Sequence, residues 1–133
     1  MKLSRASDYS VRILVQLAKV RDKATNASLA KELRIAPAYL VKLVRELARR
    51  RLVRTIKGKG GGVEILQDPK KITLLDVVEL NEGPLVLSDC LFDAKYCDQS
   101  ASCGLKIKIA VVQRELKRIL GKTTIADLID KRR

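Results

Sequence analysis

The chain has 133 residues, which favours one domain with at most a small appended element. Apolar residues make up 47% of it and aromatic residues only 3%, so leucine, isoleucine and valine must fill the core. No apolar run approaches a membrane span, and the first residues lack the apolar core of a secretory signal. We therefore expect a cytoplasmic protein without a membrane partner. The net charge of +13 favours a polyanionic binding partner.

The positive charge is concentrated in the first half of the chain. Residues 1–66 carry sixteen Lys and Arg against five Asp and Glu, whereas residues 67–133 carry twelve against ten. This asymmetry is typical of a nucleic-acid-binding module followed by a more neutral module. A cationic face that only keeps the protein in solution is the alternative.

The first 50 residues carry the signals of three helices. Apolar spacing predicts a helix over residues 4–20, capped by Ser4, with a stripe of Val11, Leu14, Val15 and Ala18. A short helix over Ser28–Leu33 follows, introduced by Thr25 or Asn26. Pro37 then opens a third helix that runs to about Arg50, because the N–H that proline lacks needs no partner in a first turn. Its expected buried stripe is Leu40, Val44 and Leu47.

A glycine-tipped hairpin is expected after the third helix. Residues 52–57 and 63–66 are strand-like, and Gly58-Lys59-Gly60-Gly61-Gly62 between them predicts a flexible tip. Three helices followed by such a hairpin is the element order of a winged helix-turn-helix, whose third helix enters the major groove of DNA. Nine cations and one acid lie between Arg34 and Lys59. The expected DNA contacts are Ala38, Tyr39 and Lys42 at base edges, Arg45 and Arg49 at phosphates, and Lys57 and Lys59 on the wing.

The second half predicts a small helix, an aperiodic loop and a long helix. Thr73 with Asp76 forms the pattern of a capping box, and Gly83-Pro84 ends that helix. Residues 84–102 have no clear period. From Cys103 to Gly121, apolar residues step by four and three as a heptad seam, namely Leu105, Ile109, Val112, Leu116 and Ile119. A second copy of the chain is the simplest partner for this seam, and a short helix over 123–129 precedes a basic tail.

These signals divide the chain into three parts. We expect a winged helix-turn-helix over 1–83, a cysteine-bearing loop over 84–103, and a dimerisation helix with a tail over 104–133. The expected fold class is mainly α with a small β-hairpin wing.

The cysteines of the chain are confined to one segment, Cys90-x6-Cys97-x5-Cys103, and there is no histidine. Thiolates bind iron–sulfur clusters, zinc and copper(I), but zinc sites show tighter cysteine pairs than these gaps allow. The grouping therefore favours an iron–sulfur cluster, although three sulfurs are one ligand short of the usual four. A thiol switch, or cysteines with no ligand role, stays open.

Several motifs together resemble the Rrf-two (Rrf2) family of bacterial regulators. They are Met1-Lys2-Leu3-Ser4, Asp8-Tyr9-Ser10-Val11-Arg12, Pro37-Ala38-Tyr39-Leu40, and Leu52-Val53-Arg54 with the glycine run. The resemblance extends through the cysteines and the long helix. It implies a homodimeric winged-helix repressor or activator, IscR-like or NsrR-like. It also implies a 2Fe–2S or 4Fe–4S cluster on Cys90, Cys97 and Cys103.

The chain departs from this family in its fourth ligand. IscR-like members have a histidine shortly after the third cysteine, where this chain has Gly104-Leu105-Lys106, and the first cysteine gap is x6 where x5 is frequent. Some NsrR-like members use an acidic residue from the first helix of the partner subunit, and Asp8 occupies that kind of position. Without the resemblance, Asp8 would be interpreted as a carboxylate that stabilises a helix start. The other candidates are Asp93, Asp98, Glu82 or a small molecule.

The sequence therefore predicts a homodimer that binds operator DNA and senses redox state, nitric oxide or iron–sulfur status. The first alternative is a regulator of the same fold that senses by thiol oxidation. An enzyme with a catalytic cysteine is a weaker alternative, because the chain has no histidine for a Cys–His pair and no phosphate-binding glycine motif. We expect no enzyme and no catalytic residues. A nucleic-acid-packaging protein would leave the cysteine group unexplained.

Overall fold

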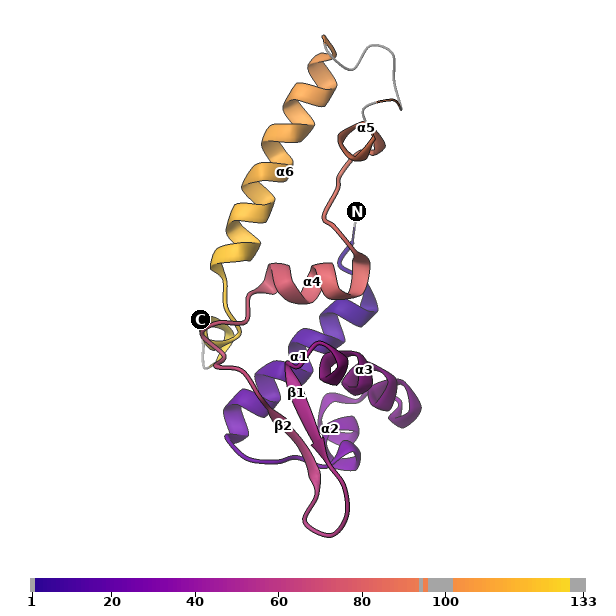
Figure 1. The fold of residues 1–133 in the computed structure, drawn as a ribbon, viewed down its shortest axis with the longest axis vertical. Coiled ribbons are helices and arrows are strands. Elements are labelled where there is room, and N and C mark those ends of the chain that lie inside the picture. Colours follow the sequence, from indigo (N-terminus) through magenta and orange to yellow (C-terminus); the bar gives the residue numbers. More distant parts are fainter. Residues whose placement is uncertain (1, 94, 96–101, 130–133) are drawn as a thin grey trace.

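The computed structural model describes residues 2–93, 95 and 102–129. Its elements are α1 (Arg5–Val20), α2 (Asn26–Leu33), α3 (Pro37–Arg49), β1 (Val53–Ile56), β2 (Gly62–Ile65), α4 (Leu74–Glu82), α5 (Asp89–Phe92), α6 (Gly104–Lys122) and the 3₁₀-helix η1 (Ala126–Leu128). In Figure 1, α1–α3 and the hairpin form the lower part, α4 crosses the middle, and α6 extends away from both. This order confirms the expected mainly helical fold with a two-stranded wing.

Local capping explains where the first two helices begin. The Ser4 hydroxyl accepts a hydrogen bond from the Ser7 N–H at 3.1 Å, as expected of a cap. The Thr25 hydroxyl does the same for the Ser28 N–H at 3.1 Å. Because Thr25 is the cap, α2 begins at Asn26, two residues before the predicted start.

The buried face of α1 differs from the predicted stripe. Val11 and Val15 are only half-buried, whereas the fully buried line is Ser7, Ser10, Ile13, Leu14, Leu17 and Ala18. The reason is that α1 is the central helix and packs against α2, α3, α4 and β2 together. The periodicity identified a helix correctly, but these neighbours, together with η1, decided which of its sides is covered.

The hairpin is antiparallel and slightly shorter than predicted. Val53 pairs with Ile65 and Ile56 with Gly62, so the expected strand ends at Leu52, Lys57 and Leu66 lie outside the ladder. Gly62 belongs to β2 rather than to the hairpin tip. The backbone of Ala24, between α1 and α2, also forms a bridge with Val63.

The segment after α6 returns to the core of the winged domain. The Ile125 side chain is fully buried, its N–H donates to the Ile72 carbonyl at 2.9 Å, and the Leu74 N–H donates to the Thr123 carbonyl at 2.9 Å. The expected helix over 123–129 is reduced to the three residues of η1. The C-terminal segment and the winged domain therefore share one core. The capping box of Thr73 and Asp76 at the start of α4 is confirmed.

α6 lies on the body of the protein with one side only. It packs against α4 and, near its start, against α5, a short helix that the sequence did not predict. No residue of 104–122 is buried. Within the predicted seam, Ile109 and Leu116 are half-buried, whereas Leu105, Val112 and Ile119 are 70%, 53% and 53% exposed. None of the helices in the described part of the chain could cross a membrane.

Candidate functional site

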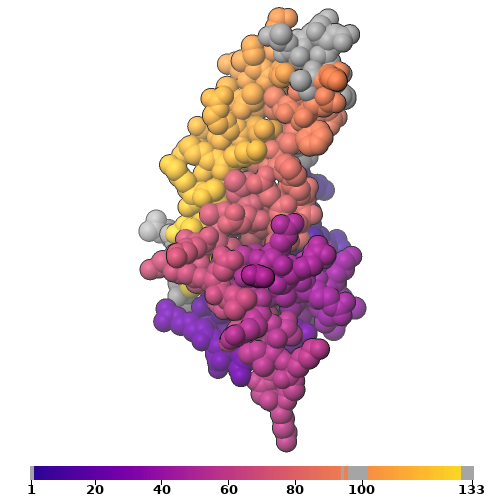
Figure 2. Space-filling model, in the orientation of Figure 1, coloured from indigo at the N-terminus to yellow at the C-terminus, as the bar shows by residue number. Residues whose placement is uncertain are grey.

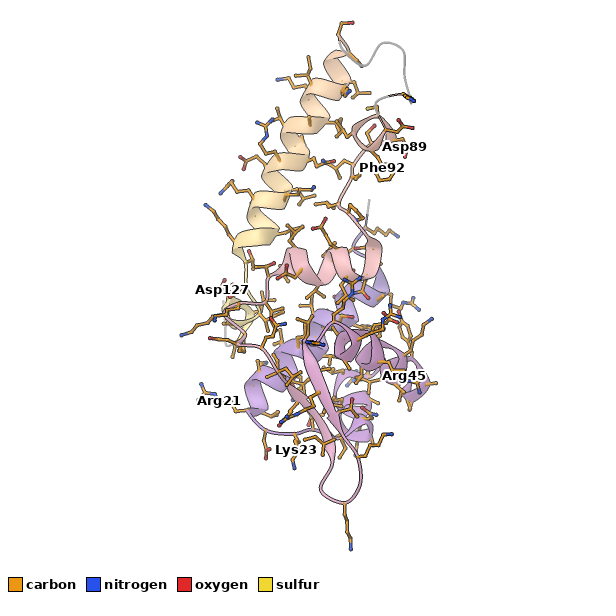
Figure 3. All side chains as sticks on the ribbon, in the orientation of Figure 1. Arg21, Lys23, Arg45, Asp89, Phe92 and Asp127 are labelled. Atoms are coloured by element: carbon orange, nitrogen blue, oxygen red, sulfur yellow. The ribbon has the colours of Figure 1, made fainter. Side chains whose placement is uncertain are left out.

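The solvent-facing side of α3 carries most of the predicted DNA contacts. Ala38, Lys42, Arg45 and Arg49 are exposed, and the opposite side is buried by Leu40, Leu43, Val44 and Leu47. Figure 3 shows Arg45 pointing outward from α3. The apolar side therefore holds the helix while the basic side is free to meet a polyanion.

Two of the predicted contacts have additional roles in the structure. Tyr39 is half-buried, and its ring meets the ring of Tyr9 edge-on at a centroid distance of 5.9 Å. Tyr39 thus helps to fix α3 on α1. Arg49 forms an ion pair with Glu46 at 3.2 Å, but its side chain remains 72% exposed, so the pair is weak and leaves the guanidinium accessible.

The wing presents two further cations. Lys57 and Lys59 are exposed beyond the ladder of β1 and β2. The hairpin forms the narrow projection at the lower end of the molecule in Figure 2. Farther from the tip, Arg54 and Glu64 are directly opposite each other on the two strands and form an ion pair. This pair stabilises the strands and leaves Lys57 and Lys59 as the cations closest to the tip.

Two of the cysteines are in the described part of the chain, and the elements that carry them lie in the upper part of Figure 1. Cys90 is in α5, Cys103 is the residue that precedes α6, and both are free, half-buried cysteines. Cys97 and Asp98 lie outside the described residues. The Cys90 sulfur is 3.2 Å from the Ser88 hydroxyl oxygen. Cys103 makes no side-chain capping bond, so its sulfur is available at a helix N-terminus, where negative charge is stabilised.

The described residues of one chain do not assemble a metal site by themselves. Among residues 2–93, 95 and 102–129, no group of three Cys, Asp or Glu side chains is close enough to hold a metal ion. Asp93 is exposed and accepts the Lys95 N–H at 2.9 Å in a local turn. Further ligands would have to come from residues outside this described part, such as Cys97 or Asp98, from a small molecule or from another chain.

Asp8 lies in the first turn of α1, which is distant from the start of α6 that Cys103 precedes. Its carboxylate forms an ion pair with Arg12 at 3.1 Å and its side chain is 40% exposed. Figure 1 shows the start of α1 beside α4, whereas the start of α6 is at the far end of the molecule. For a group that Cys103 binds, Asp8 of the same chain is therefore distant, and an Asp8 ligand would come from a second subunit.

Glu82 has a structural role that the sequence did not reveal. Its carboxylate accepts the Ser4 N–H at 3.2 Å and the Ser7 hydroxyl at 2.9 Å, so it occupies the N-terminus of α1. Asn81 next to it donates to the hydroxyl of the buried Ser10 at 3.3 Å. The only signal in the sequence was the presence of serines at helical spacing on an otherwise apolar face. The contacts link α1 to the end of α4, from which the cysteine-bearing segment begins.

Replacing Glu82 with alanine is expected to destabilise the fold by about 1–3 kcal/mol, because the fully buried Ser7 hydroxyl loses an acceptor and α1 loses a carboxylate at its start. The measurement is the midpoint of urea denaturation. Glu32→Ala is the matched control, because Glu32 is exposed and bonds only Gln16 among the contacts described, and it should stay within about 0.5 kcal/mol. Equal effects of both substitutions would contradict a specific role for Glu82.

The exposed side of α6 combines the apolar seam with a local ion pair. An Arg118 guanidinium nitrogen donates to a Glu115 carboxylate oxygen at 2.8 Å. This hydrogen bond and the positive charge of Arg118 lower the pKa of Glu115. Both side chains are exposed, so the pair contributes to the helix surface and not to its packing. The exposed leucine, valine and isoleucine of the seam have no partner in the described part of this chain that covers them.

Comparisons with known proteins agree with this architecture. The Rrf2 family model, described as an iron-dependent transcriptional regulator, matches residues 3–131. The HTH-type transcriptional regulator NsrR of Bacillus subtilis is 33% identical and covers 97% of this chain and 90% of its own length. Protein aau3 of Rhizobium meliloti is 29% identical and covers 99% of this chain and 87% of its own length.

Solved structures show the same arrangement. CymR, the global cysteine regulator of B. subtilis, superposes with a TM-score of 0.82 at 27% identity, over 100% of this chain and 99% of its own. IscR of T. potens superposes with a TM-score of 0.76 at 22% identity, over 96% and 85%, which is a likeness of fold. With a family match over nearly the whole length and a relative one-third identical, this chain belongs to the Rrf2 family of transcriptional regulators.

Proposed function

We propose that this protein is a homodimeric DNA-binding regulator that responds to an iron–sulfur cluster held by Cys90, Cys97 and Cys103. The observation that carries the proposal is the position of the two described thiols. They lie free on α5 and at the start of α6, beside an apolar helix side that no described residue covers. A group bound there would join the cysteine segment to the surface on which a second subunit would pack.

The DNA partner is a double-stranded operator. The basic side of α3 fits the major groove, and the wing with Lys57 and Lys59 fits the adjoining backbone or minor groove. Lys42 and Ala38 lie towards the start of α3 and are proposed to reach base edges, while Arg45 and Arg49 bind phosphates. Bacterial operators lie in the cytoplasm, and the proposal places the protein there.

The dimer is proposed to form along α6. Leu105, Val112 and Ile119 are separated by two intervals of seven residues, so they lie along one side of the helix. Exposed apolar side chains arranged in this way are stabilised when a second copy covers them. A two-fold dimer would also present two α3 helices to two half-sites of an operator.

The donor set fits iron–sulfur chemistry. Three thiolates supply soft ligands, and the chain contains no histidine that would favour a zinc site with nitrogen ligands. When bound, a cluster would supply iron that reacts with oxidants or nitric oxide and so changes its ligation. What the protein contributes is the placement of the sulfurs: Cys103 holds one at the start of α6, and the Ser88 hydroxyl is in hydrogen-bond range of the Cys90 sulfur.

Asp8 of the partner subunit is proposed as the fourth ligand. Its carboxylate is exposed enough to reach another chain, and among the described residues its ion-pair partner is Arg12, four residues along the same helix. A ligand with such an alternative partner can exchange, because an exposed ion pair of this kind is worth only a few tenths of a kcal/mol to about 1 kcal/mol. Asp8 would thus alternate between Arg12 and the cluster.

Asp8→Ala is expected to shorten the lifetime of the cluster at least about tenfold, the loss typical of a weakened metal site. The measurement is the decay of visible absorbance after a chelator is added to anaerobically isolated protein. Arg12→Ala is the matched control, since it removes the same ion pair and leaves the carboxylate in place. An Asp8 variant with an unchanged cluster lifetime and DNA affinity would reject Asp8 as a ligand, and an equal loss in the Arg12 variant would assign the effect to the ion pair.

A thiol-based regulator without a cluster is the second candidate. The likeness to CymR, described as a global cysteine regulator, favours it, and so do the free thiols of Cys90 and Cys103. Anaerobic isolation separates the two proposals. A coloured protein that contains iron and sulfide supports the cluster, whereas a colourless protein whose DNA affinity changes on oxidation supports the thiol switch.

A further inference from the structure

The short connection between α1 and α2 lies directly against the wing. The Ala24 N–H donates to the Val63 carbonyl at 2.9 Å, and the Val63 N–H donates to the Ala24 carbonyl at 2.7 Å. Two residues that exchange both bonds form a closely held antiparallel pair. β2 is therefore flanked by β1 on one side and by Ala24 on the other, so the wing is attached to the domain beyond its own two strands.

Gly62 is required by this close approach. A Cβ atom at position 62 would be 2.8 Å from the Ala24 carbonyl oxygen, and the backbone there has a φ of +151°. The sequence suggested that the glycine run makes a flexible tip. At Gly62, however, the missing side chain allows the connection to pack on the wing, which restricts the hairpin at the end of the ladder next to its tip.

Lys23 continues the attachment to the tip of the wing. Its Nζ atom donates to the carbonyl of Gly60 at 2.7 Å, across 37 positions of sequence. Gly60 lies in the turn that the bond from the Gly61 N–H to the Gly58 carbonyl closes at 3.0 Å. Figure 3 shows Lys23 beside the hairpin, below the C-terminal end of α1 and Arg21. The hydrogen bond spans from the body of the domain to the part of the wing next to Lys59.

We propose that Lys23 is a positioning residue for DNA binding, which holds the wing tip in the pose that lets Lys57 and Lys59 reach the DNA. This inference rests on the wing being part of the DNA interface. A tip that is already ordered in the free protein loses less conformational freedom on binding, so the attachment raises affinity without adding a contact to DNA. Among the lysines that the structure describes, Lys23 is the one whose ammonium group donates a hydrogen bond to the wing backbone.

The salt dependence of binding separates positioning from direct contact. A lysine that neutralises a phosphate releases a counterion, so its removal makes the negative slope of log affinity against log salt less steep by about 0.9 per contact. A lysine that only orders the free wing leaves the contacts of Lys57 and Lys59 in the complex unchanged. Its removal therefore changes the affinity by the same factor at every salt concentration. If both copies of Lys23 in a dimer contacted phosphates directly, their removal would make the slope less steep by about 1.8.

The test uses the full-length protein and a duplex that the wild type selects from a random-sequence pool. We expect Lys23→Met to weaken binding by the dimer about 5- to 150-fold at every salt concentration, the range for losing one hydrogen bond in each of two protomers, with an unchanged slope. Lys23→Arg should recover affinity to within about twofold, because a guanidinium also donates to a carbonyl. Lys19→Met is the matched control, an exposed lysine in the last turn of α1 for which no such bond is seen among the described contacts.

A second readout follows the wing without DNA. Amide exchange at Gly61, which the turn protects, should become faster in Lys23→Met and stay as in the wild type in Lys19→Met. The proposal is overturned if the salt slope of Lys23→Met is less steep than that of the wild type by about two. It is also overturned if Lys23→Met binds DNA with wild-type affinity, if its amide exchange at Gly61 is unchanged, or if Lys19→Met loses as much affinity as Lys23→Met. If the wild type selects no duplex at all, the proposed function fails instead, and the two failures are distinct.

Discussion

Replacing Cys103 with serine is expected to abolish the visible absorbance of the anaerobically isolated protein and to reduce its bound iron to background. The serine hydroxyl is a poor ligand for iron–sulfur clusters, which are held by thiolates. The fold should persist, because Cys103 precedes α6 as its cap residue and serine is among the best residues at such a position. Iron analysis and absorbance measure the loss, and circular dichroism checks that the helices remain.

The neighbouring Ser102→Ala is the matched control for this experiment. Ser102 is exposed and adjacent in sequence, so its replacement disturbs the same segment without removing a sulfur. A Cys103→Ser protein that keeps its iron would contradict the proposed ligand set. A wild type that is colourless, with an oxidation response that Cys103→Ser removes, would instead support the thiol switch.

Replacing Val112 with glutamate is expected to convert the protein into a monomer. Val112 lies midway along the exposed seam and is 53% exposed in the single chain, so a dimer along α6 would bury a charge there from each subunit. Affinity for an operator with two half-sites should fall by at least about 100-fold, since the two winged helix-turn-helix domains are no longer linked. Analytical ultracentrifugation measures the association state, and titration of the operator duplex measures the affinity.

Arg114→Gln is the control for the charge change. It lowers the net charge by the same single unit at an exposed position of α6 that is outside the seam. We expect it to remain dimeric, with a binding change that high salt removes. If Val112→Glu also stays dimeric and retains its affinity, the subunits associate through another surface.

α1 runs from the contacts with Glu82 to the connection that is bonded to the wing. Its first turn carries Asp8 and is held by Glu82, and the residues just beyond its last turn, Lys23 and Ala24, are bonded to the wing. A helix of 16 residues is about 24 Å long and moves largely as one body. A displacement at its start would therefore be expected to reach the wing as well as α3.

Local signals in the sequence predicted most of the helices and both strands of the hairpin. The cap at Ser4, the proline that opens α3, and the capping box of Thr73 and Asp76 each act over three or four residues, so they can be recognised without a fold. The charge distribution and motif resemblance likewise led to the Rrf2 family, which the comparisons show. The ligand set, the DNA contacts and the dimer are still predictions.

Contacts between distant segments could not be predicted in the same way. The bond of Glu82 to Ser7 spans 75 positions and that of Lys23 to Gly60 spans 37. The sequence offers Glu82 as a candidate iron ligand. A carboxylate near cysteines gives the same sequence pattern whether it binds a metal or accepts hydrogen bonds at the N-terminus of a helix. α5 was not predicted, because four residues carry too little periodicity to be distinguished from a loop.

The sequence by itself determined the family, the identity of most helices and strands, and the side chains available for chemistry. Only the tertiary structure decided which face of α1 is buried, that Ile125 closes the core from the far end of the chain, and that the glycine-rich wing is held against the α1–α2 connection. The physical reason is that helix signals and caps act between near neighbours. Burial and the partners of polar groups depend instead on which distant segments the packed core brings together.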